Sequence, residues 1–315
     1  MGRLPVAEVL LAAPRGFCAG VSRAIKAVRD ALEVFGPPVY VRHAIVHNET
    51  VVRELEQQGA VFVEELSEVP RGGVVVFSAH GVSPAIAREA RRRGLRAHDA
   101  VCPLVAKVHR EVEHHAAAGR HVVVVGHAGH PEIVGTLGHA SEGAATVVAS
   151  VGDVERLRFA ADRPMAYAVQ TTFSVDDAAG IVAALKRRFV DLAGPRTSDI
   201  CYATTNRQAA VRVIAAQADA VIVAGARFSS NANRLAEVAR ESCAAVQLVG
   251  DADELKWNEL PPLGGRIGLT AAASTPESEV GEILHALRQR YRLAVTEIRS
   301  ANETTTFRPV AIGRA

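Results

Sequence analysis

Short apolar runs alternate with longer amphipathic tracts along almost the whole chain. Valine- and isoleucine-rich runs, which are typical of buried parallel strands, occupy residues 38–41, 121–126 and 220–225. A tract with helical spacing of its apolar residues precedes each run, at 21–34, 104–118 and 204–218. The same succession of helix and strand therefore occurs three times.

Each of these strands is followed by the same further elements. A second helix, a second strand, a short acidic turn, a third strand and a final helix come in that order. The final helices begin with start signals at Ser83-Pro84, Ser174 and Thr275-Pro276. The repeat predicts an α/β fold: a trefoil of three pseudo-threefold-related units, each with a small, mainly parallel sheet, around a central cavity.

The boundaries of the units follow from the repeat. The first α/β unit is expected at 20–102 and the second at 103–197, and the third is expected to combine 198–290 with the N-terminal strand in 1–19. Residues 291–315 are expected to form a C-terminal tail that packs across the core. In parallel sheets ligands bind beyond the carboxyl ends of the strands, so the loops at those ends are the candidate site.

Three of the four cysteines occupy equivalent places in the repeat. Cys18, Cys102 and Cys201 each follow a short extended stretch and open a helical tract, where the helix N-terminus lowers a thiol pKa. The cysteines lack the paired C-x₂-C spacing that is typical of a zinc site. A reducing compartment is expected, so they do not indicate a disulfide framework. An iron–sulfur cluster with three cysteine ligands fits best and leaves one iron open for substrate. The alternative is three buried structural cysteines, as expected for Cys243.

Polar side chains crowd the loops that follow the predicted strands. They are His43, His47, Asn48, His80, His127, His130, Glu132, Thr171, Thr172, Ser229, Ser230, Asn231, Asn233 and Ser274. Histidines, serines and asparagines beside helix N-termini are typical of an anion-binding site, and phosphate or diphosphate is the expected ligand. Glu132 is the only carboxylate in these loop motifs, so it is the candidate general acid. Its alternative role is to cap the helix that begins at Pro131.

Composition narrows the class of protein. The chain has 315 residues, of which 49% are hydrophobic and 22% charged, and its net charge is +2, as in an ordinary globular protein without a polyanion-binding surface. The arginine-rich segment Arg88–Arg96 is interpreted as a solvated helix end that Gly94 caps. No apolar run is long enough for a membrane helix, and the first apolar run predicts a strand rather than a signal peptide. We expect a cytoplasmic protein with neither a membrane nor a nucleic-acid partner.

The loop sequences resemble, in the same order, those of one known family. The matching segments run from about Leu11 to Pro276 and are RGFCAGV, YVRHAIVHN, SAHGVS, DAVCPLV, GHAGHPE, QTTFSVDD, DICYATTNRQ, SSNANRL and TAAASTP. They are similar to the motifs of the 4-hydroxy-3-methylbut-2-enyl diphosphate reductases, the LytB-type enzymes of the last step of the non-mevalonate isoprenoid pathway. The resemblance implies a trefoil of three α/β domains around an oxygen-sensitive iron–sulfur cluster.

The resemblance also implies a role for each matched residue. It makes Cys18, Cys102 and Cys201 the cluster ligands. It assigns the diphosphate to His47, His80, His130, Ser229, Ser230, Asn231 and Ser274. It places Thr171 against the substrate hydroxyl and makes Glu132 the proton donor.

The implied reaction is a reductive dehydroxylation of (E)-4-hydroxy-3-methylbut-2-enyl diphosphate. The hydroxyl oxygen binds the open iron of a [4Fe–4S] cluster, one per chain, through which two electrons arrive singly, and water leaves. Protonation at either end of the allyl unit gives isopentenyl or dimethylallyl diphosphate. Because the sequence has no GxGxxG fingerprint and no P-loop, the electrons come from an external carrier, and the resemblance implies ferredoxin or flavodoxin. A single chain encloses such a site, so a monomer is expected.

The chain departs from the family pattern at two loop positions. Ala44 stands where glutamate is common, and Ala272 stands where glycine is common before Ser274. Alanine at 272 alters the local backbone if that glycine has a positive φ. The C-terminal segment FRPVAIGRA is also less typical of the family.

Two other functions stay open from the residues alone. An iron–sulfur dehydratase would use the open iron as a Lewis acid and would need no added reductant. An iron–sulfur sensor would regulate nucleic acid through Arg88–Arg96, although the net charge is near zero and no DNA-reading motif is present.

Overall fold

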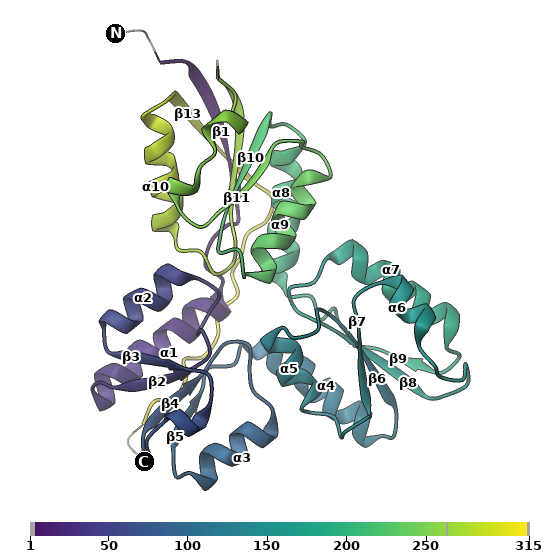
Figure 1. Ribbon diagram of the computed structural model, residues 1–315. Coiled ribbons are helices and arrows are strands. Elements are labelled where there is room, and N and C mark those ends of the chain that lie inside the picture. The colour runs from purple at the N-terminus through teal and green to yellow at the C-terminus, as the bar shows by residue number, and fades with distance from the viewer. Residues whose placement is uncertain (1–3, 263, 314–315) are drawn as a thin grey trace. The chain divides into compact units, whose positions relative to one another are not determined.

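The computed structural model describes residues 4–262 and 264–313, and the strands of this part of the chain form three parallel sheets with helices packed against them (Figure 1). The predicted α/β class is therefore confirmed. Contacts divide the chain into two compact units. Unit 1 comprises Met1–Ala19, His47–Glu49 and Tyr202–Thr306, and unit 2 comprises Gly20–Val46, Thr50–Cys201 and Phe307–Ala315.

The first sheet of unit 2 has the strand order β3-β2-β4-β5. Its strands are β2 (Val39–Arg42), β3 (Ala60–Val63), β4 (Val74–Phe77) and β5 (Arg96–Asp99). The helices of this part are α1 (Ala19–Phe35), α2 (Glu49–Gln57) and α3 (Pro84–Arg92). Every residue of β4 is buried, as expected for a continuous apolar run at the centre of a parallel sheet, whereas β5 is a polar edge strand.

The second sheet of unit 2 repeats this order as β7-β6-β8-β9. Its strands are β6 (His121–Val125), β7 (Ala145–Val148), β8 (Met165–Val169) and β9 (Leu192–Ala193). The helices are α4 (Pro103–Ala117), α5 (Pro131–Leu137), α6 (Val151–Arg156) and α7 (Val175–Arg188). Two apolar clusters use alternate residues of β6, so both faces of this sheet are covered.

The sheet of unit 1 has the order β11-β10-β12-β1-β13. Its strands are β1 (Val6–Ala13), β10 (Ala220–Ala224), β11 (Val246–Val249), β12 (Gly265–Ala271) and β13 (Arg292–Arg299). The helices are α8 (Tyr202–Ala215), α9 (Ser230–Arg240) and α10 (Glu277–Arg288). Here β1 takes the place that β5 and β9 have in the other sheets, so the threefold repeat is a repeat of strand topology.

The structure differs from the expected elements in three places. Strand β13, which pairs with β1 in parallel, lies in the segment expected to be a tail, because its short apolar residues are interrupted by Arg, Thr and Glu and give a weak strand signal. The acidic turns form short helices, namely α6 and the 3₁₀ turns Leu66–Glu68 and Ala252–Glu254, next to a further 3₁₀ turn at Trp257–Glu259. Helix α10 has Pro276 at its N-cap and no side-chain cap.

The structure bears on several local features of the sequence, and it confirms the expectations for the end of α3 and for Cys243. The arginine-rich segment ends α3 at Arg92, with Arg93 as C-cap and Gly94 at φ 68°, whereas its last arginine, Arg96, begins β5. Cys243 is buried at 4% exposure. Ala272 causes no strain, because the non-glycine residue with a positive φ among the described residues is His43. In the described part of the chain, none of the helices has both the length and the apolar character needed to cross a membrane.

Candidate functional site

The predicted site residues share one position in the topology: each follows the carboxyl end of a parallel strand. Strands β1, β5 and β9 lead to Cys18, Cys102 and Cys201, and the inner strands of the three sheets lead to the polar loops. This edge of a parallel sheet is where helix N-termini and free backbone N–H groups gather. Some of these residues belong to unit 2 and the others to unit 1.

In unit 2, the side chain of Glu132 is held by Thr171. Glu132 Oε1 accepts a hydrogen bond of 2.7 Å from the backbone N–H of Thr171, and Oε2 accepts one of 2.8 Å from its hydroxyl. The glutamate is 2% exposed, and burial raises its pKa to about 7, against the opposing effect of the two hydrogen bonds. Glu132 can therefore hold a proton near neutral pH, as a general acid must.

The alternative role of Glu132 as a helix cap is wrong. Helix α5 has His130 at its N-cap, and the Nδ1 atom of that imidazole accepts from the N–H of Glu132 at 3.1 Å. Because His130 supplies the cap, the Glu132 carboxylate is left to bind Thr171.

Further contacts join other predicted residues of unit 2 to one another. The rings of His80 and His130 meet edge to face with their centroids 5.7 Å apart. The N–H of Cys102 donates to the carbonyl of Ala79 at 3.0 Å, and the N–H of Cys201 donates to the carbonyl of Thr171 at 3.1 Å. Backbone hydrogen bonds thus join each cysteine segment to a loop that carries a predicted substrate ligand.

In unit 1, a comparable set of bonds joins three loops. The N–H of Cys18 donates to the carbonyl of Ala273 at 3.3 Å, while the N–H of Ala273 donates to Asn231 Oδ1 at 2.9 Å. The hydroxyl of Ser274 donates to the carbonyl of His47 at 2.9 Å. The Cys18 segment and the loops of His47, Asn231 and Ser274 therefore form one connected group.

Asn231 offers the clearest sign of a ligand. Its side chain is 4% exposed and its Oδ1 is bound to Ala273, yet its Nδ2 is buried without a hydrogen-bond partner among the described residues. A buried amide donor without a partner is costly, and an anionic oxygen would satisfy it. It lies in the first turn of α9, whose N-cap is Ser229, so the helix N-terminus also favours an anion.

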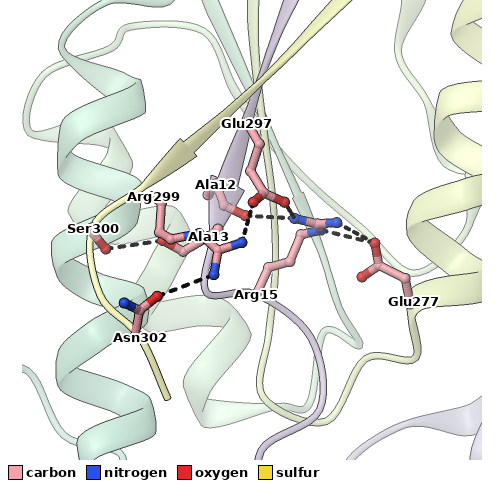
Figure 2. Close-up of polar contacts among 8 residues, drawn as sticks. All are labelled: Ala12, Ala13, Arg15, Glu277, Glu297, Arg299, Ser300 and Asn302. Atoms are coloured by element: carbon pink, nitrogen blue, oxygen red, sulfur yellow. Dashed lines mark hydrogen bonds and ion pairs between the residues drawn. The ribbon is translucent and has the colours of Figure 1, made fainter. Parts of the chain in front are cut away.

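Arg15 fixes the strand end that leads to Cys18 (Figure 2). Its guanidinium binds Glu277 at the start of α10, Glu297 on β13 at 3.2 Å and the carbonyl of Ala12 at 3.1 Å. Arg299 donates to the same Glu297 at 2.6 Å. Bonds to both neighbouring elements hold the chain in place three residues before the cysteine.

Arg207 fixes the next part of the same segment. It is fully buried, and its Nη2 and Nε atoms donate to the carbonyl of Gly16 at 2.7 and 3.1 Å. Its Nη1 atom binds Glu303 Oε1 at 2.8 Å and the carbonyl of Ala203 at 3.0 Å. Close by, the N–H of Ala19, directly after Cys18, donates to the hydroxyl of Tyr202 at 3.2 Å.

The surroundings of the three cysteines are chemically suited to ligands of an iron–sulfur cluster. None of them is in a disulfide, and all three are partly exposed. Each lies directly before a helix: α1, α4 or α8. The N-terminal ends of these helices stabilise thiolates and the anionic cluster that they would hold. The meeting of the three sulfur atoms stays a prediction.

The buried carboxyl group of Glu132 has a measurable effect on stability. Its folded pKa of about 7 lies above the ordinary value of 4.5, so the folded state loses stability as pH rises between these two values. We expect Glu132→Gln to raise the free energy of unfolding by roughly 2–3 kcal/mol at pH 8 and by much less at pH 5. Urea unfolding at both pH values measures this, with the exposed Glu142→Gln as control. An equal effect at the two pH values would contradict the assignment.

Removal of the Arg207 guanidinium is expected to be strongly destabilising. Arg207→Met leaves the carboxylate of Glu303 and the carbonyl of Gly16 without their buried partner, which costs about 3–5 kcal/mol. Urea unfolding checks this value. The matched control is Arg212→Met on the same helix, which breaks a partly exposed ion pair with Glu241 and should cost less than about 1 kcal/mol. Similar losses in both variants would show that burial of the ion pair does not matter here.

Sequence reasoning did not find Arg15, Arg207 or Glu279. Glu279 is 3% exposed and accepts hydrogen bonds of 3.1 and 3.3 Å from Asn48 Nδ2. These residues bind groups that are distant in sequence, so no local spacing marks them. The one available signal was their place beside the cysteine and histidine motifs, since Arg15 and Arg207 lie in RGFC and TTNRQ.

The chain is similar to known proteins over nearly its whole length. The family described as LytB protein matches residues 9–288. A 4-hydroxy-3-methylbut-2-enyl diphosphate reductase of Paracoccus denitrificans is 52% identical and covers 98% of both chains, and one of Beijerinckia indica is 51% identical over 96% of this chain and 95% of that protein. The solved structure of the E-1-hydroxy-2-methyl-but-2-enyl-4-diphosphate reductase from Plasmodium falciparum has a TM-score of 0.90 at 37% identity, covering 98% of this chain and 96% of its own.

Proposed function

The chain belongs to the LytB protein family and is an enzyme of the reductase class, and we propose that it converts (E)-4-hydroxy-3-methylbut-2-enyl diphosphate to isopentenyl and dimethylallyl diphosphate. The reaction replaces the substrate hydroxyl by hydrogen, consumes two electrons and two protons, and releases water. The observation that carries the proposal is the buried Glu132–Thr171 pair, with a carboxyl pKa of about 7, beside the histidine loops.

The electron chemistry requires a group that the amino acids do not provide. Cys18, Cys102 and Cys201 would hold a [4Fe–4S] cluster, and their places before three helix N-termini support this. When bound, the cluster would supply single electrons and one iron without a cysteine ligand. Ferredoxin or flavodoxin would provide the electrons from outside.

The diphosphate would be bound by the predicted histidine, serine and asparagine donors. His80 and His130 supply imidazoles in unit 2. In unit 1 the predicted donors are His47, Ser229, Ser230, Asn231 and Ser274. The unpartnered Nδ2 of Asn231 and the N-terminus of α9 support this role, because both favour an anionic oxygen.

Glu132 would deliver a proton through Thr171. Protonated Glu132 can donate from Oε2 to the Thr171 hydroxyl, 2.8 Å away, while its Oε1 accepts the backbone N–H of the same residue. The hydroxyl is then free to donate its own proton towards the substrate. The two-point contact fixes the carboxyl group, so the proton is presented in one direction.

The cellular setting forms part of the proposal. The enzyme would act as a monomer in the cytoplasm, because the substrate is a soluble diphosphate and one chain carries the complete set of predicted ligands. The division into α/β units at 20–102, 103–197 and 198–290 plus the N-terminal strand belongs to the same proposal.

The experiment is an anaerobic turnover assay. Protein reconstituted with iron and sulfide receives the allylic diphosphate with and without a low-potential one-electron donor. We expect both products with the donor and neither without it. Absence of turnover in a cluster-loaded sample would overturn the proposal, and product formation without the donor would favour a dehydratase.

A further inference from the structure

One buried histidine, His109, contacts two segments that carry predicted site residues. It lies on α4, the helix that follows Cys102, and is 5% exposed. It is neither a predicted ligand nor a predicted catalytic residue. Its contacts with Gly81, Gly135 and His139 lie within unit 2.

The first contact is with the loop of His80. Gly81, the next residue, has φ 77°, and a Cβ atom built on it would lie 2.4 Å from His109 Cε1 and 2.8 Å from Val101 Cγ2. The imidazole therefore occupies the space that a side chain at position 81 would need. Its edge rests directly on the backbone beside His80.

The second contact is with α5, the helix that starts after His130 and contains Glu132. A Cβ atom on Gly135 would lie 3.6 Å from His109 Nε2 and 3.3 Å from the carbonyl oxygen of Gly81. Helix α5 and the His80 loop thus approach each other without a side chain between them at this point. The imidazole edge fills the remaining space beside the two glycines.

A second imidazole supports the first. The ring of His139 stacks on His109 with centroids 4.3 Å apart, and its Nε2–H donates to the carbonyl of Val82 at 3.3 Å. His109 and His139, which we call the imidazole clamp, therefore contact Gly81 and Val82, the two residues after His80. Burial, reinforced by the neighbouring His139 and Arg110, lowers the pKa of His109 to about 3, so the ring is neutral at physiological pH.

The imidazole of His109 leaves one buried polar atom without a partner among the described residues, although an apolar side chain could fill a buried position. Within the described part of the chain, His109 Nε2 is buried without a hydrogen-bond partner. A buried polar atom in this state destabilises the fold, and an apolar residue would avoid the penalty. An imidazole is nevertheless present because the narrow space between the backbones of Gly81 and Gly135 fits its flat edge.

We propose that His109, supported by His139, is a positioning residue that sets the separation of His80 and His130 and thereby the affinity for the diphosphate group. This inference rests on the proposed function for the role of those two histidines. The rings of His80 and His130 are 5.7 Å apart, and each is attached to one of the two backbones that His109 holds. Loss of the imidazole lets these backbones shift, so two donors no longer match one diphosphate.

The test measures binding of inorganic pyrophosphate to the reconstituted protein by calorimetry. We expect His109→Ala to weaken binding at least tenfold and to raise KM for the allylic diphosphate much more than it lowers kcat. Added imidazole should restore affinity, because a cavity of about 530 Å³, lined by Val82, Ser83, His109 and His139, gives access to the vacated space. His114→Ala, an exposed position on the same helix, should bind like the wild type.

A second variant keeps the inference testable if His109→Ala does not fold. Gly135→Ala favours the helix but places a methyl group 3.3 Å from the Gly81 carbonyl, so it should push the His80 loop and weaken pyrophosphate binding several-fold. Wild-type affinity in either folded variant, or no rescue of His109→Ala by imidazole, overturns the inference and leaves the proposed function intact. Failure of the wild-type protein to bind pyrophosphate instead overturns the proposed role of His80 and His130.

Discussion

Glu132→Gln is expected to retain its cluster and to lose reductase activity by roughly 10²–10⁴-fold, the usual contribution of a general acid. Glutamine keeps the hydrogen bond from the Thr171 N–H and pairs with the Thr171 hydroxyl, so the local structure should persist. It has no ionisable proton to give. The loss should therefore appear in kcat, with iron content and substrate affinity close to those of the wild type.

Anaerobic steady-state kinetics and iron analysis together measure this effect. Glu142→Gln, an exposed glutamate of the same unit, serves as the matched control and should keep full activity. Thr171→Val should also lower kcat, because it removes the hydroxyl through which Glu132 is proposed to deliver its proton. An active Glu132→Gln enzyme would remove the proton-donor assignment.

Replacement of any of the three repeat cysteines by alanine is expected to abolish turnover and most of the bound iron. Cys18, Cys102 and Cys201 each precede a helix N-terminus, and a cluster with two thiolate ligands is held far more weakly than one with three. We expect activity to fall by about three orders of magnitude or more in each single variant. Anaerobic iron and sulfide analysis after reconstitution provides the measurement.

The fourth cysteine offers the control for this experiment. Cys243 is buried in the apolar core of unit 1, where its thiol donates weakly to the carbonyl of Ala245 at 3.5 Å. Cys243→Ala should lose some stability but keep iron and activity. Full iron content in one of the three repeat variants would exclude that cysteine as a ligand.

The sheets were predictable because their signal is local. The valine-rich strands β6 and β10 are almost entirely apolar and bounded by polar loops, which identifies them in the sequence alone. Strand β13 escaped prediction because its partner β1 lies at the other end of the chain and most of its residues are exposed. An exposed edge strand is specified by pairing, which no short window of sequence contains.

The residue types of the candidate site could be predicted from the sequence, but the residues that hold its loops in place could not. The cysteines and histidines belong to motifs that repeat along the chain, and their equivalent positions after the predicted strands identify them as candidates. Arg207 and His109 act through distant backbone atoms, the carbonyl of Gly16 and the backbone of Gly81. The sequence also leaves open whether Glu132 caps its helix. The structure excludes this role, because the Nδ1 atom of His130 accepts the N–H of Glu132 at the helix N-cap.

The most direct test of the account is the Mössbauer spectrum of the ⁵⁷Fe-reconstituted protein, recorded anaerobically before and after the allylic diphosphate is added. If three thiolates leave one iron without a cysteine ligand, about a quarter of the iron signal should change its isomer shift on addition of substrate, while the rest stays constant. A spectrum in which all irons are equivalent and indifferent to substrate would contradict the three-cysteine centre.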